Sequence, residues 1–296
     1  MTRHSVEYGL DRRPSETVVT SEPSSSARRT DSHRLYAAIV FIPLFYVLVR
    51  YLPPAAFFAL VLAVALFALT EFYRMHFRER RATVEISLGL GLAGFLLISL
   101  QWPNLVSQQT VWLVTVGAVL ASRLFLVREI GRSLVDSAVV VFGILYIGFS
   151  LGHLLLIRAL PDAAFLIFFV VLITWAGDTG AYYAGVHLGH RKLAPTISPN
   201  KTIEGLMGGV ILAIVAAFAA RFWFLPSFTT ADCLATGVLL AAAGVLGDLS
   251  ESALKRSAGV KDSGTMIPAH GGMLDRVDSL LFTAPAFYYY MTLVKG

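Results

Sequence analysis

Long apolar runs recur along this chain, and several of them are long enough to cross a lipid bilayer. The hydrocarbon core of a bilayer is about 30 Å thick, and an α-helix rises about 1.5 Å per residue, so that one span takes roughly 20 apolar residues. The composition agrees, because 56% of the 296 residues are hydrophobic and only 15% are charged. Soluble domains carry about 25% charged residues. The sequence therefore predicts an all-α integral membrane protein, a polytopic bundle of transmembrane helices.

The apolar runs predict about nine transmembrane spans. These are Leu35–Leu52, Ala55–Thr70, Val84–Leu100, Val111–Leu126, Leu134–Ile157, Ala163–Tyr183, Leu206–Phe224, Leu234–Leu249 and Val277–Val294. The second and eighth runs are short, which leaves open a count of eight or a half-span. Residues 1–34 are polar and rich in Ser, Thr and Arg, and we expect a disordered cytoplasmic tail there. We divide the rest into amino-terminal spans at 35–160 and a carboxy-terminal region at 161–296.

The charge of the loops predicts the orientation. Basic residues gather in the tail and in the loops after the second, fourth, sixth and eighth spans, whereas the alternate loops carry almost none. Basic loops stay on the cytoplasmic side of a membrane. We therefore expect a cytoplasmic amino terminus in the cell membrane, with the polar motifs facing the cytoplasm. This pattern accounts for the net charge of +5 without nucleic acid. The single cysteine, Cys233, excludes an internal disulfide and indicates a small apolar filler.

Acidic residues cluster at the ends of the later spans, within the stretches Thr174–Gly205 and Gly247–Asp278. An ionised carboxylate near hydrocarbon is costly, so it usually faces a polar cavity and has a partner. Two pairs are spaced three residues apart, which places the members of each pair on one helix face. Mg²⁺ prefers such oxygen ligands and often bridges them to substrate phosphates. The candidate metal ligands are Asp178, Asp248, Asp275 and Asp278, with Glu251 beside them.

Simple ion pairing at the membrane surface is the competing interpretation of these acids. Glu251 and Lys255, four residues apart on a helix, fit it well. Several acids beside several basic groups on one side of the membrane favour a site for metal and phosphate instead.

Basic, glycine and hydroxyl residues lie close to the acids in the sequence. A site for a metal alone would not need the basic groups, whereas a polyphosphate would. Gly271 and Gly272 permit close backbone approach, although a plain turn explains a Gly–Gly pair equally well. Ser198 and Thr202 are candidate hydroxyl ligands or helix caps. His270 is a candidate phosphate donor or acid–base group, and equally a structural loop residue. The basic candidates are Lys201, Lys255, Arg256, Lys261 and Arg276.

Some polar residues lie within apolar runs and are assigned no catalytic role, and missing motifs exclude one class of function. Glu85, Asp136 and His153 fall within apolar runs, where hydrogen bonding between helices is the default. The sequence has no Walker A motif, no GxGxxG between a strand and a helix, and no GxSxG. Transport driven by a P-loop ATPase domain within this chain is therefore excluded.

The stretch from Ser252 to Asp278, SALKRSAGVKDSGTMIPAHGGMLDRVD, resembles the signature of the phosphatidate cytidylyltransferase family, also called CDP-diacylglycerol synthase. The preceding GDLSES and the earlier DTGAYYAG through SPNKTIEGLMGG are also similar to the family. The resemblance covers roughly the last 120 residues. The signature positions present are Ser252, Lys255, Arg256, Lys261, Asp262, His270, Gly271, Gly272, Asp275, Arg276 and Asp278.

The resemblance implies a metal-dependent nucleotidyltransferase that joins CTP and phosphatidate into CDP-diacylglycerol and pyrophosphate, a step of phospholipid biosynthesis. Carried onto this chain, it makes Asp248 and Asp275 the best metal ligands for Mg²⁺ or Mn²⁺, with Asp278 and Asp178 next. The partners are then phosphatidate, CTP and membrane lipids, while a homodimer is left open. The expected catalytic residues are Asp248, Asp275, Asp278 and Lys255. The expected substrate-binding residues are Lys201, Ser198, Thr202, Arg256, Lys261, Asp262, His270, Gly271, Gly272 and Arg276.

Two other functions compete with this one. A CTP-dependent lipid-alcohol kinase, acting on dolichol or phytol, is related in architecture, but the full signature argues for the cytidylyltransferase. A transporter that uses the acids as an ion path would need charges distributed through the depth of the bilayer. Here they crowd one side.

Overall fold

The structure is a computed structural model, and it describes residues 45–295 except 48, 79–81, 126–129 and 265–270. The described helices and strands all belong to one unit, Phe45–Gly296. The predicted tail at residues 1–34 lies outside the described residues, as does most of the first predicted span, Leu35–Leu52.

The amino-terminal helices follow the predicted apolar runs. Helix α2 begins at a proline, whose fixed φ and missing N–H suit the first helical turn. Helices α5 and α6 are joined by the π-helical segment η2, and the three form one continuous rod, Ser133–Arg158. The bounds are α2 Pro54–His76, α3 Thr83–Gln101, α4 Gln108–Phe125, η1 Ile130–Arg132, α5 Ser133–Gly143, η2 Ile144–Phe149 and α6 Ser150–Arg158.

The carboxy-terminal region contains helices and one small β-hairpin. Strands β1 and β2 pair antiparallel, with Lys192 opposite Thr202 and Ala194 opposite Ser198. Glu204, in the first turn of α8, accepts hydrogen bonds from the backbone N–H groups of His190 (3.0 Å) and Arg191 (3.1 Å) and so holds the base of the hairpin. The bounds are α7 Ala163–Leu188, β1 Lys192–Ala194, β2 Ser198–Thr202, α8 Ile203–Trp223, α9 Thr230–Ser257, α10 Leu274–Val277 and α11 Leu280–Leu293.

Six of the described helical segments are long and apolar enough to cross a membrane: α2, α3, the α5–α6 rod, α7, α8 and α9. The multi-pass helical prediction is confirmed at this level. Helices α4 and α11, of 18 and 14 residues, fall outside this group. The second and eighth runs, which are short in the sequence, lie in longer helices, because α2 has 23 residues and α9 has 28. Both helices continue past their apolar runs through polar residues such as Glu71 and Glu251.

Small residues bring α7 and α8 into close contact. A methyl group on Gly180 would lie 2.5 Å from the carbonyl oxygen of Gly208, and one on Gly209 would lie 2.9 Å from that of Gly177. Glycine at such positions lets two helix backbones approach, as is common in membranes. The contact fixes the late part of α7, including Asp178, against the helix that follows the hairpin.

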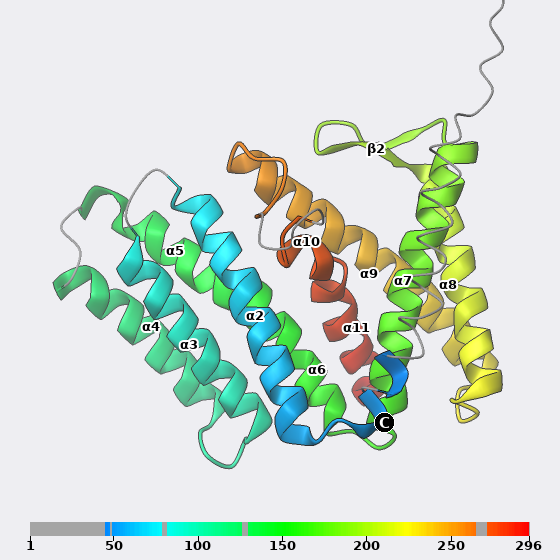
Figure 1. Ribbon diagram of the computed structural model, residues 1–296, viewed down its shortest axis with the longest axis horizontal. Coiled ribbons are helices and arrows are strands. Elements are labelled where there is room, and N and C mark those ends of the chain that lie inside the picture. The colour runs from blue at the N-terminus through cyan, green and yellow to red at the C-terminus, as the bar shows by residue number, and fades with distance from the viewer. Residues whose placement is uncertain (1–44, 48, 79–81, 126–129, 265–270, 296) are drawn as a thin grey trace, which may run out of the picture. The chain divides into compact units, whose positions relative to one another are not determined.

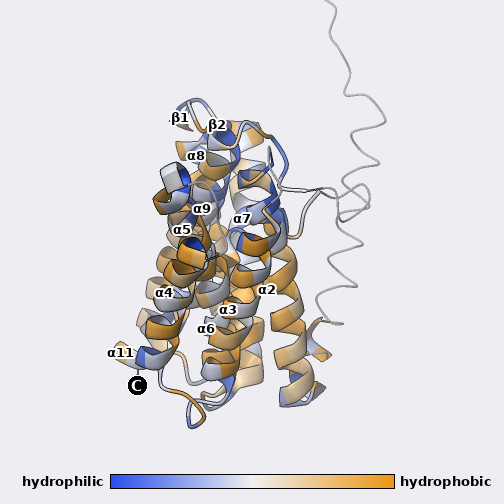
Figure 2. Ribbon diagram, turned by 90° about the vertical axis from the view of Figure 1, so that its left-hand side faces the viewer, coloured by the Kyte–Doolittle hydropathy of each residue, from blue (hydrophilic) through white to orange (hydrophobic). Residues whose placement is uncertain are grey.

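The helices pack in two neighbouring sets, as Figure 1 shows. Helix α3 packs against α2, α4 and η2 in the first set, and α8 packs against α7 and α9 in the second. Helix α11 lies between the sets, with contacts to both α6 and α9. Helix α2 also contacts the short α10. Hydrophilic residues gather at the end of the helices that carries the hairpin (Figure 2).

The polar residues inside the first set pair with one another. Arg123 of α4 donates to Glu85 of α3 at 2.9 Å, and its Nη1 lies 3.9 Å from Asp136 Oδ2 of α5. All three residues are at most 8% exposed. His153 contacts the carbonyl oxygen of Phe149, one turn earlier in its own rod. The predicted hydrogen bonding between helices is therefore confirmed for Glu85, while Asp136 lies at ion-pair distance from Arg123 and His153 contacts its own rod.

Candidate active site

A cavity of about 670 Å³ opens at the hydrophilic end of the second set of helices. It is formed by the last turns of α7, the hairpin, the start of α8, the end of α9 and the segment that joins α10 to α11. Its lining residues are Asp178, Ala181, Tyr182, Gly185, Val186, Leu193, Ser198, Asn200, Lys201, Thr202, Gly205, Leu206, Val245, Asp248, Asp275, Asp278 and Ser279. The two polar stretches of the sequence therefore meet in space, as predicted.

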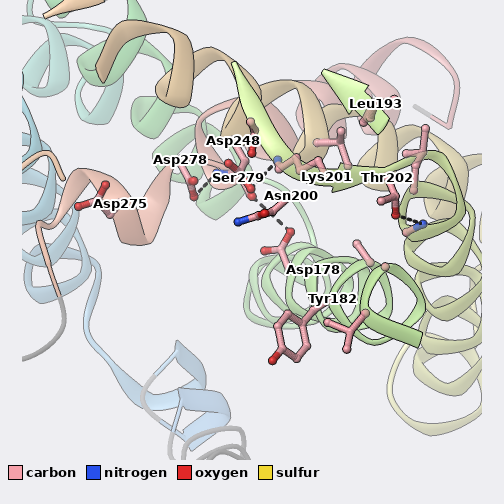
Figure 3. Close-up of a pocket in the computed structure, with 17 residues that line it drawn as sticks. Asp178, Tyr182, Leu193, Asn200, Lys201, Thr202, Asp248, Asp275, Asp278 and Ser279 are labelled. Carbon is pink, nitrogen blue, oxygen red and sulfur yellow. Dashed lines mark hydrogen bonds and ion pairs between the residues drawn. The ribbon is translucent and has the colours of Figure 1, made fainter. Parts of the chain in front are cut away.

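Three carboxylates and one lysine point toward one another in this cavity (Figure 3). Asp248 forms an ion pair of 2.5 Å with Lys201, and their side chains are 35% and 21% exposed, so that both remain accessible to water. Asp248 is close enough to interact electrostatically with Asp178 and Asp278. These four side chains come from α9, β2, α7 and the α10–α11 junction, so the tertiary fold assembles the cluster.

Ser279 ties two of these acids together. Its backbone N–H donates to Asp278 Oδ1 at 2.7 Å, and its hydroxyl lies 3.4 Å from Asp178 Oδ1 (Figure 3). The neighbouring backbone is close to α9, because a methyl group on Gly247 would lie 3.1 Å from the Cα of Ser279. Gly247, directly before Asp248, therefore lets the α10–α11 junction approach the aspartate of α9.

The fourth predicted acid, Asp275, lines the same cavity but has a denser set of partners. Lys255 of α9 donates to Asp275 Oδ1 at 2.7 Å and also pairs with Glu251 at 2.5 Å. The other oxygen, Oδ2, accepts from the N–H of Gly272 at 2.9 Å and from the hydroxyl of Ser263 at 2.9 Å. In Figure 3 Asp275 lies apart from Asp178, Asp248 and Asp278. Lys255 thus joins α9 to α10 through this aspartate.

These partners decide the ionisation of Asp275. Burial by itself raises the pKa of the carboxyl group, but hydrogen bonds with Glu251, Lys255 and the Gly272 amide, and the charge of Lys255, outweigh it. The net effect holds the pKa of Asp275 well below its usual range. Asp275 is therefore an anion at neutral pH, as a metal or cation partner requires.

The Gly–Gly pair shapes the segment before α10. Gly271 has a φ of 80°, in the left-handed region that side chains disfavour. The N–H of Gly272 is used by Asp275, and a methyl group on Gly272 would collide with the hydroxyl of Ser263. The glycines therefore allow this segment to close around Asp275.

Four other described signature residues are not among those that line the cavity. Arg256, Lys261, Asp262 and Arg276 are exposed. Arg256 donates to the carbonyl oxygen of Val260 at 3.5 Å. His270 lies outside the described residues. The substrate-binding role of all five residues therefore stays a prediction.

The two predicted hydroxyl residues sit at opposite ends of β2. Ser198 begins the strand and lines the cavity. Thr202 is the N-cap of α8, where its hydroxyl accepts from the N–H of Gly205 at 3.1 Å. The capping interpretation of Thr202 is therefore confirmed, and the same residue also borders the cavity.

Several residues of the site were not predicted from the sequence. Asn200, Tyr182 and Ser279 line the cavity, and Ser263 contacts Asp275. Glu71 of α2, in the amino-terminal half, accepts a hydrogen bond from the N–H of Leu274, which directly precedes Asp275. An acid directly after an apolar run was a usable signal for Glu71, because a carboxylate there needs a partner. Ser and Asn in loops carry no comparable signal.

The donor set fits a hydrated divalent cation better than a cage made only of protein. Within the described part of the chain, no three His, Cys, Asp or Glu side chains are arranged closely enough to hold a metal ion. Mg²⁺ usually keeps several waters and takes one or two carboxylates together with substrate phosphates. Asp248 and its neighbours around an open cavity satisfy that requirement.

Comparison with known proteins identifies the family. The model of the cytidylyltransferase family matches residues 32–294, almost the whole of the chain. The chain belongs to the cytidylyltransferase family. The match includes the amino-terminal helices, for which the sequence motifs gave no resemblance beyond apolar character.

Individual relatives give the same result. The chain is 36% identical to the phosphatidate cytidylyltransferase of Bacillus subtilis over 275 residues, which cover 87% of this chain and 94% of the relative. The phosphatidate cytidylyltransferase of Haemophilus influenzae is 47% identical over 131 residues, covering 43% of this chain and 45% of that protein. An uncharacterized protein of Escherichia coli, YnbB, is 43% identical over 148 residues, or 48% of this chain and 49% of that protein.

Proposed function

We propose that this membrane protein transfers CMP from CTP to phosphatidate, which yields CDP-diacylglycerol and pyrophosphate. The observation that carries this proposal is the cavity itself. Acids from α7, α9, α10 and the α10–α11 junction line it together with Lys201 of the hairpin, at the hydrophilic end of apolar helices, and Lys255 of α9 pairs with one of these acids, Asp275. The similarity to the Bacillus subtilis enzyme, over most of both chains, supports the same reaction.

This reaction requires the protein mainly to position the two reactants and to stabilise charge. A phosphate oxygen of phosphatidate attacks the α-phosphorus of CTP in line, the new P–O bond forms, and the bond to pyrophosphate breaks. The enzyme aligns the two reactants and stabilises the charge on the phosphoryl oxygens. No protein nucleophile is needed. We assign a phosphate contact to Lys201, and its position in the cavity beside Asp248 supports this role.

In this proposal the carboxylates hold the metal ion, and the basic side chains position the acids or bind phosphates. Asp248 and Asp275 are the first candidates to hold Mg²⁺ or Mn²⁺, and Asp278 and Asp178 are the next. A bound divalent cation supplies charge neutralisation for the phosphates and the leaving pyrophosphate. Lys255 holds Asp275 and Glu251 in place through ion pairs of 2.7 and 2.5 Å. Arg256, Lys261 and Arg276 remain candidates for phosphates at the mouth of the site.

The membrane setting is part of the proposal. Phosphatidate keeps its acyl chains in the leaflet and its phosphate at the interface, while CTP arrives from water. A cavity at a hydrophilic end of the helices serves both. From the loop charges we infer a cytoplasmic amino terminus, about nine spans in the cell membrane and a catalytic region at 161–296. Labelling of single cysteines in the loops of intact cells tests this orientation.

Labelled CTP separates this reaction from the kinase alternative. Purified protein is incubated with phosphatidate, Mg²⁺ and CTP that is labelled at the α-phosphate or at the γ-phosphate, and the lipid product is identified by mass. The proposal expects the α-label and the cytidine in the lipid. Transfer of the γ-label alone, in a parallel incubation with dolichol or phytol, overturns it. Ion transport by the protein in vesicles, without any CTP-derived lipid, favours a transporter.

A further inference from the structure

A buried glutamate of the amino-terminal half contacts the signature segment. Glu71, near the end of α2, is 3% exposed. Its Oε2 accepts a hydrogen bond from the backbone N–H of Leu274 at 2.9 Å and lies 3.3 Å from the hydroxyl of Ser263. These partners are 203 and 192 residues away along the chain, and they stand on the two sides of the segment that precedes α10. One side chain thus contacts both Ser263 and Leu274.

Two glycines beside these partners leave room for this carboxylate. A methyl group on Gly264 would lie 2.8 Å from Glu71 Oε1, and one on Gly272 would lie 2.5 Å from Glu71 Oε2. Any larger residue at either position would displace the glutamate. The two glycines therefore form a seat for Glu71, in addition to the turn that Gly271 makes.

Glu71 reaches the site through Ser263 and Leu274. The hydroxyl of Ser263 lies 2.9 Å from Asp275 Oδ2 and 3.3 Å from Glu71 Oε2, so one side chain stands between the two carboxylates. Leu274, whose N–H is held by Glu71, directly precedes Asp275 and is fully buried. A buried N–H without an acceptor is costly, so Leu274 depends on this glutamate.

We propose that Glu71 is a positioning residue, which fixes the segment around Ser263 and Leu274 so that Asp275 faces the cavity. Glu71 itself touches no substrate. The amino-terminal helices thereby contribute to turnover through the contacts of this glutamate with Leu274 and Ser263. This inference rests on the proposed function for its kinetic readout but not for its structural readout.

The test compares three variants in purified protein. Glu71→Gln keeps an amide oxygen that accepts from Leu274, so its kcat should stay within about fivefold of the wild type. Glu71→Leu removes the acceptor at similar volume, and its kcat should fall by about a hundredfold, the size expected for losing a hydrogen bond to a buried group. Glu85→Leu is the matched control, because Glu85 is an equally buried acid of the same half that does not contact the segment.

Hydrogen–deuterium exchange of the peptide at 271–277 gives the structural readout. We expect faster exchange there in Glu71→Leu, wild-type exchange in Glu71→Gln, and wild-type exchange in Glu85→Leu even though its thermal midpoint falls. Gly264→Ala, which fills the seat while keeping the glutamate, should reproduce the faster exchange.

Each opposing result overturns the inference in its own way. Equal inactivity of Glu71→Gln and Glu71→Leu, with unchanged exchange, would assign the carboxylate a direct chemical role. Unchanged exchange and kcat in Glu71→Leu would leave Glu71 no role in positioning. A loss of activity that merely follows the folded fraction would make it a general stability residue. If the wild type forms no CDP-diacylglycerol, the proposed function fails, while the exchange experiment still decides the role of Glu71.

Discussion

Both halves of the molecule contain a cluster of charged residues, but the two clusters differ in burial and arrangement. In the amino-terminal half, Glu85 of α3 and Asp136 of α5 surround Arg123 of α4, and all three are at most 8% exposed. In the carboxy-terminal half, Asp248 is 35% exposed at its side chain and lines a cavity of about 670 Å³ with Asp178 and Asp278. Charges that pair internally join helices, whereas charges that line a cavity are available to a ligand.

Removal of divalent metal is expected to have the largest effect on turnover. The effect should be confined to the chemistry in the cavity. Excess chelator should abolish formation of CDP-diacylglycerol, because the phosphates then lose the cation that neutralises them. The thermal midpoint should barely change, since the Glu85–Arg123 pair needs no metal. Added Mg²⁺ or Mn²⁺ should restore turnover. Full activity in the chelator would show that turnover needs no divalent metal. The cavity acids would then not differ from the paired acids of the amino-terminal half by holding a cation.

Replacement of one cavity acid should come next in size. We expect Asp275→Asn to lower kcat by about a thousandfold, comparable to the loss of a group that stabilises transition-state charge, while the protein still inserts and folds. The matched control is Asp232→Asn on α9, where Asp232 pairs with Lys295 at 2.7 Å away from the cavity. That variant should lose stability and keep its kcat. Near-normal turnover in Asp275→Asn would exclude Asp275 as a metal ligand.

A smaller effect on turnover is expected for replacement of Lys201, the hairpin lysine that lines the cavity. Lys201→Gln removes a charge that pairs with Asp248 at 2.5 Å and borders the cavity. A hydrogen bond to a charged group contributes about 1.5–3 kcal/mol, so that kcat/KM for CTP should fall by about tenfold to a hundredfold. Steady-state kinetics with varied CTP measure it. Lys192→Gln on β1, which does not line the cavity, should behave as the wild type; an equal loss in both variants would mean that the hairpin acts only through its fold.

The smallest effect on turnover should come from the buried pair of the other half. Glu85→Gln leaves Arg123 buried beside a neutral partner, and breaking a buried ion pair costs about 3–5 kcal/mol of stability. The kcat per folded molecule should stay unchanged, as judged by activity corrected for the fraction that resists heating. A large loss of kcat without a fall in the thermal midpoint would show that the two halves do not differ in the way described.

The helices and the meeting of the two polar stretches could be predicted from the sequence, because apolar runs and clustered acids are local signals. The hairpin could not, since β2 contains Pro199 and Pro195 precedes it, and proline argues against a strand. The lengths of α2 and α9 were underestimated because hydropathy marks only the apolar part of a helix. Glu71 and Leu274 lie 203 residues apart in the sequence, and no motif near either residue indicates the contact between them.

The central claim is that carboxylates from separate helices hold a divalent cation against the phosphates of the substrates. Electron paramagnetic resonance of Mn²⁺ measures this directly, with purified protein titrated in the presence of CTP. We expect tight Mn²⁺ binding to the wild type and binding at least about tenfold weaker when Asp248→Asn and Asp275→Asn are combined, because one or two carboxylates usually anchor such an ion. Undiminished Mn²⁺ binding by the double variant would contradict it.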